Sequence, residues 1–174
     1  MALLRPKYYV SNFEHINIDR LKKQGIQLLL CDIDNTLVSY DEPHPSQSVI
    51  AFIKKVKAAG IEVALCSNAT KQRATRFSKD LDVSKTYYFS MKPLPFNFIK
   101  AKKEHGLKMH QMAIIGDQMF TDMLGGNLWG LYTILTAPIA IKDRGMTKIS
   151  RFFENIVYSF FEKTNTFKKG EFDD

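Results

Sequence analysis

The chain has 174 residues, of which 45% are hydrophobic, and it carries a net charge of +7. A chain of this length favours one domain that buries a full core. No stretch of the sequence reaches the roughly twenty apolar residues of a membrane span, and residues 1–6 lack the regions of a secretory signal. The sequence therefore predicts a cytoplasmic protein and leaves peripheral contact with the inner face of the membrane open.

The positive charge favours anionic partners such as phosphates, nucleic acid or an anionic lipid surface. The basic residues are spread over several segments and no nucleic-acid motif accompanies them, so we expect no specific nucleic-acid binding. Cys31 and Cys66 both lie in apolar runs. In a chain without a signal peptide, such cysteines are typical of buried free thiols in a reducing compartment.

The hydrophobic pattern predicts strands and helices that alternate along the chain. In chain order we expect a helix over 17–25, a strand over 26–31, a helix over 46–60, a strand over 61–66, a helix over 69–81, a strand over 87–89, a helix over 95–105, a strand over 112–115, a helix over 121–128 and a strand over 131–135. This alternation indicates βαβ units, and hence an α/β fold with a doubly wound, three-layer parallel sheet.

Reactive side chains follow four of the predicted strands, at the edge of the sheet where ligands bind in such folds. They are Asp32, Asp34 and Thr36 after the first strand, Ser67 and Asn68 after the second, Lys92 after the third, and Asp117 and Asp122 after the fourth. Each residue alone is explained as a turn, a helix cap or a solvated loop residue. Together they supply the groups that phosphoryl transfer requires.

Asp32 and Asp34 project in the same direction if the chain is still extended there. Two like charges so close repel each other. The pair is tolerable if a cation lies between the carboxylates, if one of them is protonated, or if they have separate roles at a solvent-open edge.

These residues resemble the four motifs of the haloacid dehalogenase (HAD) superfamily of phosphotransferases. The first motif is Asp32-Ile33-Asp34-Asn35-Thr36, the second is Ser67, the third is Lys92, and the fourth is Gly116-Asp117-Gln118-Met119-Phe120-Thr121-Asp122. All four occur in the right order, and the resemblance spans about residues 25–135.

The resemblance implies that Asp32 is the nucleophile and forms an aspartyl-phosphate, while Asp34 acts first as general acid and then as general base. It also implies that Mg²⁺ is held by the Asp32 carboxylate, the Asp34 backbone carbonyl and Asp117. Asp122 then either binds the metal directly or contacts a group that binds it.

The chemistry of phosphoryl transfer independently favours these residue types. Mg²⁺ prefers oxygen ligands, and together with the Lys92 ammonium it would offset charge on the transferring group. The Ser67 hydroxyl and the backbone N–H groups near Asn68 are placed to bind phosphate oxygens at the start of the following helix.

The spacing between the motifs leaves no room for a cap domain. Asp34 and Ser67 are separated by 32 residues, and Ser67 and Lys92 by 24, all of which the predicted elements use. An uncapped site admits a phosphate carried on a large molecule, or accepts small phosphates with loose selectivity.

Within the superfamily, the sequence resembles the capless subfamily IIIA group called YqeG, which is similar to the phosphatidylglycerophosphate phosphatases of mitochondria and plants. The resemblance is carried by the fourth motif with Gly125-Gly126-Asn127 after it, by Pro6-Lys7-Tyr8 and by Lys92-Pro93. It implies hydrolysis of phosphatidylglycerophosphate, a lipid phosphate, to phosphatidylglycerol. A soluble phosphomonoester or a phosphorylated nucleic-acid end remains the alternative substrate.

Two further classes of protein compete with a phosphatase: a phospho-receiver domain and a non-catalytic, RNA-associated module. A receiver lacks an acid/base aspartate two residues after the phosphorylated one, and its lysine comes last in the chain. Asp34, and the position of Lys92 before Asp117, therefore favour catalytic turnover. A pure scaffold would need none of these residues.

An apolar stripe at helical spacing marks the C-terminal part of the chain. It consists of Ile149, Phe152, Phe153, Ile156, Val157, Phe160 and Phe161. We favour a helix packed on the sheet, and an interfacial helix preceded by Lys142, Arg144 and Lys148 is the alternative. We therefore expect one domain over 1–163 and a disordered polar tail over 164–174.

Overall fold

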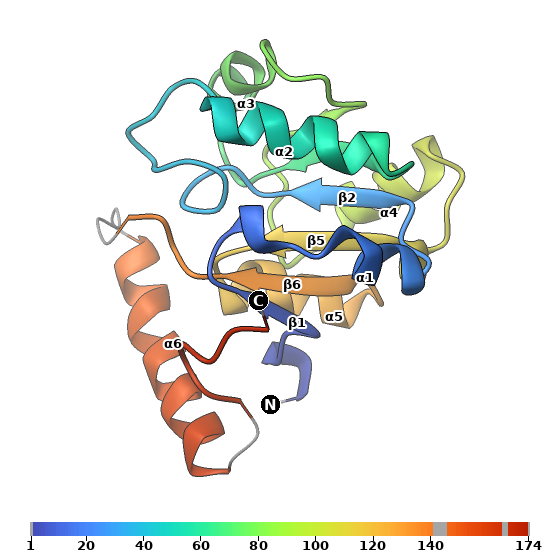
Figure 1. The fold of residues 1–174 in the computed structure, drawn as a ribbon. Coiled ribbons are helices and arrows are strands. Elements are labelled where there is room, and N and C mark those ends of the chain that lie inside the picture. The colour runs from blue at the N-terminus through green and yellow to red at the C-terminus, as the bar shows by residue number, and fades with distance from the viewer. Residues whose placement is uncertain (1, 141–145, 165–166, 174) are drawn as a thin grey trace.

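A six-stranded parallel sheet in the order β1-β6-β5-β2-β3-β4 organises the protein (Figure 1). The computed structural model describes residues 2–140, 146–164 and 167–173, and of residues 146–152 it describes the backbone alone. The strands are β1 (Tyr8–Val10), β2 (Leu28–Cys31), β3 (Glu62–Cys66), β4 (Thr86–Tyr87), β5 (Met112–Gly116) and β6 (Tyr132–Thr136). Every neighbouring pair is parallel, which confirms the predicted doubly wound α/β fold.

The helices begin largely where the sequence places polar caps. They are α1 (Ile18–Lys23), α2 (Gln47–Ala58), α3 (Lys71–Ser78), α4 (Phe96–Glu104), α5 (Leu124–Leu128) and α6 (Met146–Lys163), with short turns η1 (Ala2–Leu4), η2 (Phe13–His15), η3 (Met109–Gln111) and η4 (Met119–Met123). The side chains of Asn17, Ser46 and Thr70 each accept a hydrogen bond from the first turn of the helix that follows. Such bonds satisfy backbone donors that the helix itself leaves without partners.

Helices cover both faces of the sheet because successive strand residues point to opposite sides. Leu29 and Cys31 join the cluster formed with α1, α2 and α3, whereas Leu30 and Cys66 join the cluster formed with α4. Cys31 and Cys66 therefore lie on opposite faces as buried free thiols, as predicted. Burial raises the pKa of the Cys66 thiol to about 11, which makes it a poor nucleophile.

Two strands differ from the predicted pattern. β1 was missed because three consecutive buried residues are too short to show a period, yet they pair with β6 at the sheet edge. The strand predicted over 87–89 ends at Tyr87 instead, since Phe89 has a φ of 44° and leaves the extended region. Between Asp34 and Lys92 the chain forms only α2, β3, α3 and β4 with their loops, so residues 2–140 contain no inserted cap domain.

The helix α6 lies beside the carboxyl edge of the sheet, on the side to which the strand arrows point in Figure 1. Val157, Tyr158 and Phe161 pack in a cluster with Tyr9 of β1 and with residues of η4. Phe153, Ile156 and Phe160 are exposed. The predicted stripe thus divides into a packed side and an exposed side, while the side chains of Ile149 and Phe152, like Lys142, Arg144 and Lys148, lie outside the described residues.

The end of the chain passes close to β1. The ring of Tyr9 contacts Phe167 and Phe172 at centroid distances of 5.0 and 4.6 Å, and its backbone N–H donates to the Asp173 carboxylate at 3.0 Å. The division into a domain over 1–163 and a disordered tail over 164–174 stays a prediction. Among the described residues, no helix combines the length and the apolar character needed to cross a bilayer.

Candidate active site

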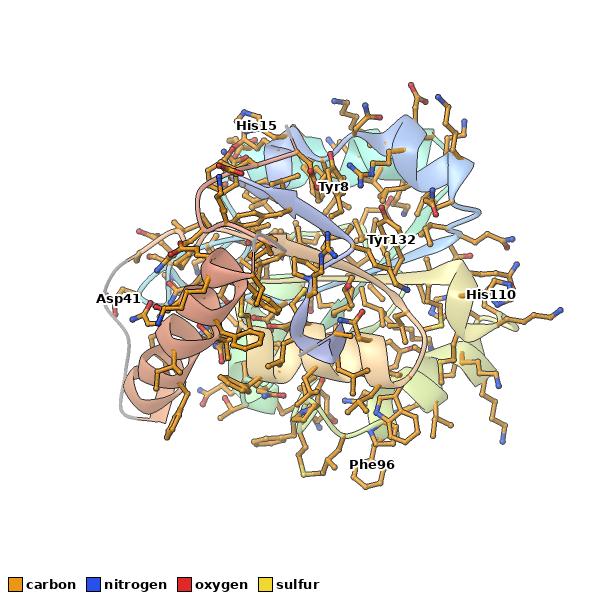
Figure 2. All side chains as sticks on the ribbon, turned by 90° about the horizontal axis from the view of Figure 1, so that it is seen from below. Tyr8, His15, Asp41, Phe96, His110 and Tyr132 are labelled. Atoms are coloured by element: carbon orange, nitrogen blue, oxygen red, sulfur yellow. The ribbon has the colours of Figure 1, made fainter. Side chains whose placement is uncertain are left out.

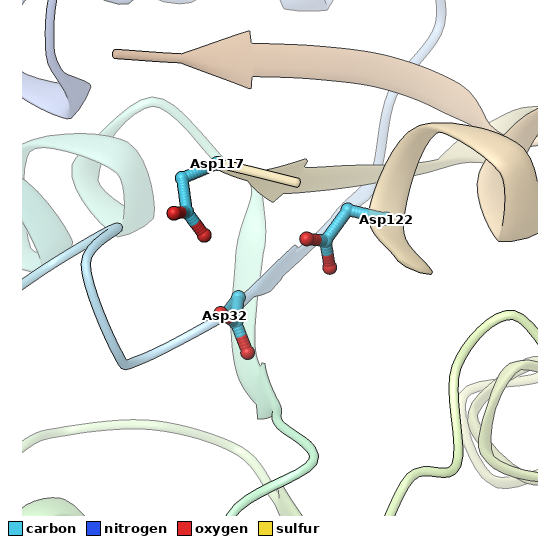
Figure 3. Close-up of side chains that lie close together, drawn as sticks. All are labelled: Asp32, Asp117 and Asp122. Carbon is cyan, nitrogen blue, oxygen red and sulfur yellow. The ribbon is translucent and has the colours of Figure 1, made fainter. Parts of the chain in front are cut away.

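Three buried carboxylates meet at the carboxyl edge of the sheet (Figure 3). Asp32 follows β2, Asp117 follows β5, and Asp122 belongs to the turn η4. One oxygen of each carboxylate lies within 4.8 Å of one oxygen of each of the others, although the side chains belong to residues up to 90 positions apart. The structure therefore brings together the three carboxylates that the sequence predicts to bind a metal.

Lys92 is the fourth member of this cluster, and its side chain is 2% exposed. Its ammonium donates to Asp32 Oδ1 at 2.9 Å, to Asp122 Oδ1 at 2.6 Å and to the Cys66 carbonyl at 2.8 Å. Burial alone would lower the pKa of Lys92, but the fields of Asp122 and Asp32 outweigh that effect and raise it. Lys92 is therefore a fixed cation placed against the predicted nucleophile.

The donor set fits a divalent cation. With three ionised carboxylates and one ammonium, the cluster of Asp32, Lys92, Asp117 and Asp122 has a net charge of −2. Carboxylate oxygens are the ligands that Mg²⁺ prefers. Gly116 preserves this arrangement, because a Cβ at that position would collide with the carboxylate of Asp122.

Asp122 is engaged through both of its carboxylate oxygens. Its Oδ1 accepts from Lys92, and its Oδ2 accepts from the Gln118 N–H at 3.3 Å and from the Thr121 hydroxyl at 3.1 Å. Asp117 accepts from the buried Thr36 hydroxyl at 3.4 Å. These contacts hold the Asp122 carboxylate against Lys92 and against the turn to which Asp122 belongs.

The second aspartate of the first motif has a different partner. Asp34 Oδ1 accepts from both Nε and Nη2 of Arg73, at 2.9 and 2.7 Å, and its side chain is 21% exposed. The following residue, Asn35, has a φ of 62°, a left-handed conformation that asparagine tolerates better than most residues. Burial raises the pKa of Asp34, and the hydrogen bonds from Arg73 oppose that shift.

Arg73 is the residue of the site that sequence reasoning missed. It lies in the first turn of α3 and also donates to the carbonyls of Glu42, at 2.6 Å, and Ser39, at 3.4 Å. It thereby ties Asp34 and the loop that follows β2 to α3. No local pattern distinguishes Arg73 from Lys71 and Arg76, the exposed basic residues of α3, because its partners lie more than 30 positions away.

Ser67 and Asn68 contact the site through the segment that carries Lys92. Asn68 Oδ1 accepts from the Lys92 backbone N–H at 2.9 Å, and Asn68 Nδ2 donates to the Lys92 carbonyl at 3.4 Å. The Ser67 hydroxyl is buried and accepts from the Ala69 N–H at 3.2 Å. Phosphate binding by Ser67, Asn68 and Lys92 stays a prediction, and the contacts of Asn68 show that its side chain positions Lys92.

A parallel α/β sheet with an aspartate cluster and a buried lysine at its carboxyl edge defines a phosphotransferase that uses aspartate chemistry. The family model of haloacid dehalogenase-like hydrolases matches residues 3–130. The chain is 35% identical over 154 residues to "Probable phosphatase YqeG" of Bacillus subtilis (strain 168), covering 88% of this chain and 89% of that protein. The protein therefore belongs to the haloacid dehalogenase-like hydrolase family and is a phosphatase.

Two more distant similarities agree with that assignment. The chain is 24% identical over 144 residues to phosphatidylglycerophosphate phosphatase 1 of Arabidopsis thaliana, and this match covers 78% of the chain but only 41% of that protein. A 3-deoxy-D-manno-octulosonate 8-phosphate phosphatase from Moraxella catarrhalis, solved with magnesium and phosphate ions, superposes with a TM-score of 0.50 at 14% identity. That superposition covers 83% of this chain and 99% of the other, and it shows the same fold.

The two hydrogen bonds from Arg73 hold the carboxylate of Asp34 in one orientation. We expect Arg73→Gln to lower kcat on the order of 10- to 100-fold with little change in KM, because Asp34 loses its fixed orientation. Turnover of a soluble phosphomonoester measures the effect. Arg76→Gln, an exposed arginine one turn later in α3, is the matched control. Equal kcat for Arg73→Gln and Arg76→Gln would contradict a positioning role for Arg73.

Proposed function

We propose that this protein is a magnesium-dependent phosphomonoester hydrolase that acts through an aspartyl-phosphate on Asp32, with phosphatidylglycerophosphate as substrate. The observation that carries the mechanism is the Lys92 ammonium, held 2.9 Å from Asp32 Oδ1 inside a cluster of three carboxylates. Such a group stabilises the ionised nucleophile and offsets the charge of an incoming phosphate dianion.

In the first half of the reaction, a carboxylate oxygen of Asp32 attacks phosphorus and the bond from phosphorus to the ester oxygen breaks. Asp34 gives a proton to the departing alkoxide. Burial, which raises the pKa of Asp34, favours the protonated form that this step requires. Lys92 remains protonated throughout and does not exchange its proton.

In the second half, Asp34 takes a proton from water as that water attacks the phosphorus of the aspartyl-phosphate. The bond from phosphorus to the Asp32 oxygen breaks, and inorganic phosphate leaves. The carboxylate of Asp32 is thereby regenerated. Asp34 ends protonated, ready to act as acid in the next cycle.

We assign the metal to Asp32, Asp117 and the backbone carbonyl of Asp34, with Asp122 supporting it through Lys92 or as a further ligand. When bound, Mg²⁺ supplies charge neutralisation for the transferring phosphoryl group. The net charge of −2 on the cluster supports a divalent ion. The magnesium ion in the Moraxella catarrhalis phosphatase gives further support, since that protein shares the fold.

Lipid phosphate as the substrate is supported by the Arabidopsis thaliana relative and by the absence of a cap domain from residues 2–140. An uncapped site accommodates a headgroup that stays attached to a membrane, whereas small free phosphates are commonly enclosed during turnover. The net charge of +7 favours approach to an anionic surface.

The nucleophile is tested by substitution. Asp32→Asn should abolish both phosphate release and labelling of the protein by a phosphorylated substrate, because an amide is a poor nucleophile. Asp34→Asn should lower kcat by several orders of magnitude, since the proton donor is lost. Asp82→Asn, at an exposed aspartate outside the site, serves as control. Residual activity of Asp32→Asn above a few per cent would exclude the covalent route.

The metal assignment is tested by chelation. EDTA should eliminate phosphate release, and excess Mg²⁺ should restore it. Asp117→Ala should raise the Mg²⁺ concentration for half-maximal activity by about tenfold or more, or abolish turnover, because one oxygen ligand is removed. Undiminished turnover in EDTA would show that Asp117 binds no required ion.

The substrate is tested by comparing phosphatidylglycerophosphate in mixed micelles with glycerol 3-phosphate at equal Mg²⁺. We expect a higher kcat/KM for the lipid, and we expect salt to reduce that advantage by screening charge. Equal or better turnover of the soluble ester, or of a phosphorylated RNA end, would move the assignment to that substrate and leave the Asp32 mechanism intact.

A further inference from the structure

Exposed apolar side chains gather on the loop between β4 and α4, which carries Lys92, and on the first residue of α4. Phe89 and Met91 are each 55% exposed, Leu94 is 48% exposed and Phe96 is 57% exposed. Figure 2 shows Phe96 projecting from the edge of the molecule. Large apolar side chains that cluster on a surface mark a site of interaction.

This loop is folded and held by hydrogen bonds. Ser90 and Lys92 point inward, and as whole residues they are 1% and 5% exposed. They alternate along the chain with Phe89 and Met91, which point outward. The Asn97 amide donates to the Tyr88 carbonyl at 3.2 Å and to the Ser90 hydroxyl at 3.0 Å, and the Leu94 N–H donates to the Met91 carbonyl at 2.9 Å. The apolar side chains are therefore held outward by the same backbone that holds Lys92 in the site.

The backbone is strained at Phe89 and Met91. Phe89 has a φ of 44° and Met91 a φ of 48°, in the left-handed region that bulky side chains rarely adopt. Glycine or asparagine would fit either position with less strain. Strained residues cluster at functional sites, and here the strain coincides with two exposed apolar side chains on either side of Ser90, next to Lys92.

The end of α5 extends this surface. The Trp129 indole donates to the Pro93 carbonyl at 3.1 Å, which ties Trp129, 39% exposed, and its neighbour Leu128, 48% exposed, to the same loop. We refer to six exposed apolar residues of the loop, of the start of α4 and of the end of α5 as the apolar rim. The apolar rim consists of Phe89, Met91, Leu94, Phe96, Leu128 and Trp129.

The sequence around the rim is strongly basic. Residues 68–104 carry seven exposed basic residues, Lys71, Arg76, Lys79, Lys85, Lys100, Lys102 and Lys103, against three exposed acidic residues, Asp80, Asp82 and Glu104. Lys71 Nζ lies 5.8 Å from the Tyr88 ring, and Lys100 and Lys103 follow Phe96 on α4 at positions i+4 and i+7. Exposed aromatic and aliphatic side chains with lysines beside them are typical of surfaces that enter the interface of an anionic bilayer.

We propose that the apolar rim is a membrane-docking surface, which inserts into the interface of an anionic phospholipid bilayer and so brings the lipid headgroup to Lys92. The proposal rests on the proposed function, since it explains how a lipid phosphate reaches the site. It assigns the membrane contact to the β4–α4 loop and not to the exposed side of α6, where Phe153, Ile156 and Phe160 lie.

The test measures binding to vesicles without turnover. The full chain is sedimented with vesicles of phosphatidylglycerol and phosphatidylcholine, and with phosphatidylcholine alone. We expect binding to the anionic vesicles only, weakened by salt. Phe89→Asn combined with Met91→Asn should reduce the affinity at least about 100-fold, since two apolar side chains are lost, while its unfolding midpoint stays equal or rises because asparagine tolerates the backbone.

The matched control is Phe153→Gln combined with Ile156→Gln, which removes two exposed apolar side chains from α6 and should leave vesicle binding unchanged. Both double variants should hydrolyse a soluble phosphomonoester as the unmodified protein does. The proposal would be overturned if the variant with Phe89→Asn and Met91→Asn still bound the vesicles. It would also be overturned if the α6 double variant lost binding. Equal binding to neutral vesicles, or concentration-dependent self-association through the rim with no vesicle binding, would overturn it as well.

The two proposals fail in distinguishable ways. If the protein binds phosphatidylglycerol vesicles through the rim but does not hydrolyse phosphatidylglycerophosphate, the docking surface is correct and the proposed substrate is wrong. If the protein hydrolyses the lipid in micelles but binds no vesicles, the proposed substrate is correct and the docking surface is wrong.

Discussion

The site depends on the ammonium of Lys92, which lies between the carboxylates of Asp32 and Asp122. Two carboxylates this deeply buried would repel each other strongly without a cation between them. Removing one partner of such a buried pair typically costs about 3–5 kcal/mol of stability, because the remaining charge is left without compensation. Neighbouring segments hold Lys92 at both ends. Its backbone N–H donates to the Asn68 side-chain amide, and its ammonium donates to the Cys66 carbonyl.

The same constraint explains why glycine precedes Asp117. Gly116 ends β5 where a Cβ would enter the space of the Asp122 carboxylate. The turn η4 then returns Asp122 towards Lys92, fixed by the N–H of Gln118 and the hydroxyl of Thr121. The spacing between the two aspartates of the fourth motif is thus set by the geometry of one turn and by the position of one cation.

The sequence predicted the fold and the four motif positions because both depend on local patterns. Alternating helices and strands indicate a parallel sheet, and the side chains at the strand ends then fall at one edge. Arg73 was not predicted, since its contacts with Asp34 and the Glu42 carbonyl arise only when distant segments pack. The left-handed residues Phe89 and Met91 were also missed, because no local rule places bulky apolar residues at a positive φ.

A contact made by α6 links the carboxylate cluster to a part of the chain that lies beyond the family match. The carboxylate of Glu154, 1% exposed, accepts a hydrogen bond of 2.7 Å from the backbone N–H of Met119, the first residue of η4. The family match ends at residue 130, whereas this glutamate comes from a helix that begins at Met146. Helix α6 therefore supports the turn that holds Asp122 beside Lys92, through a residue that lies beyond the family match.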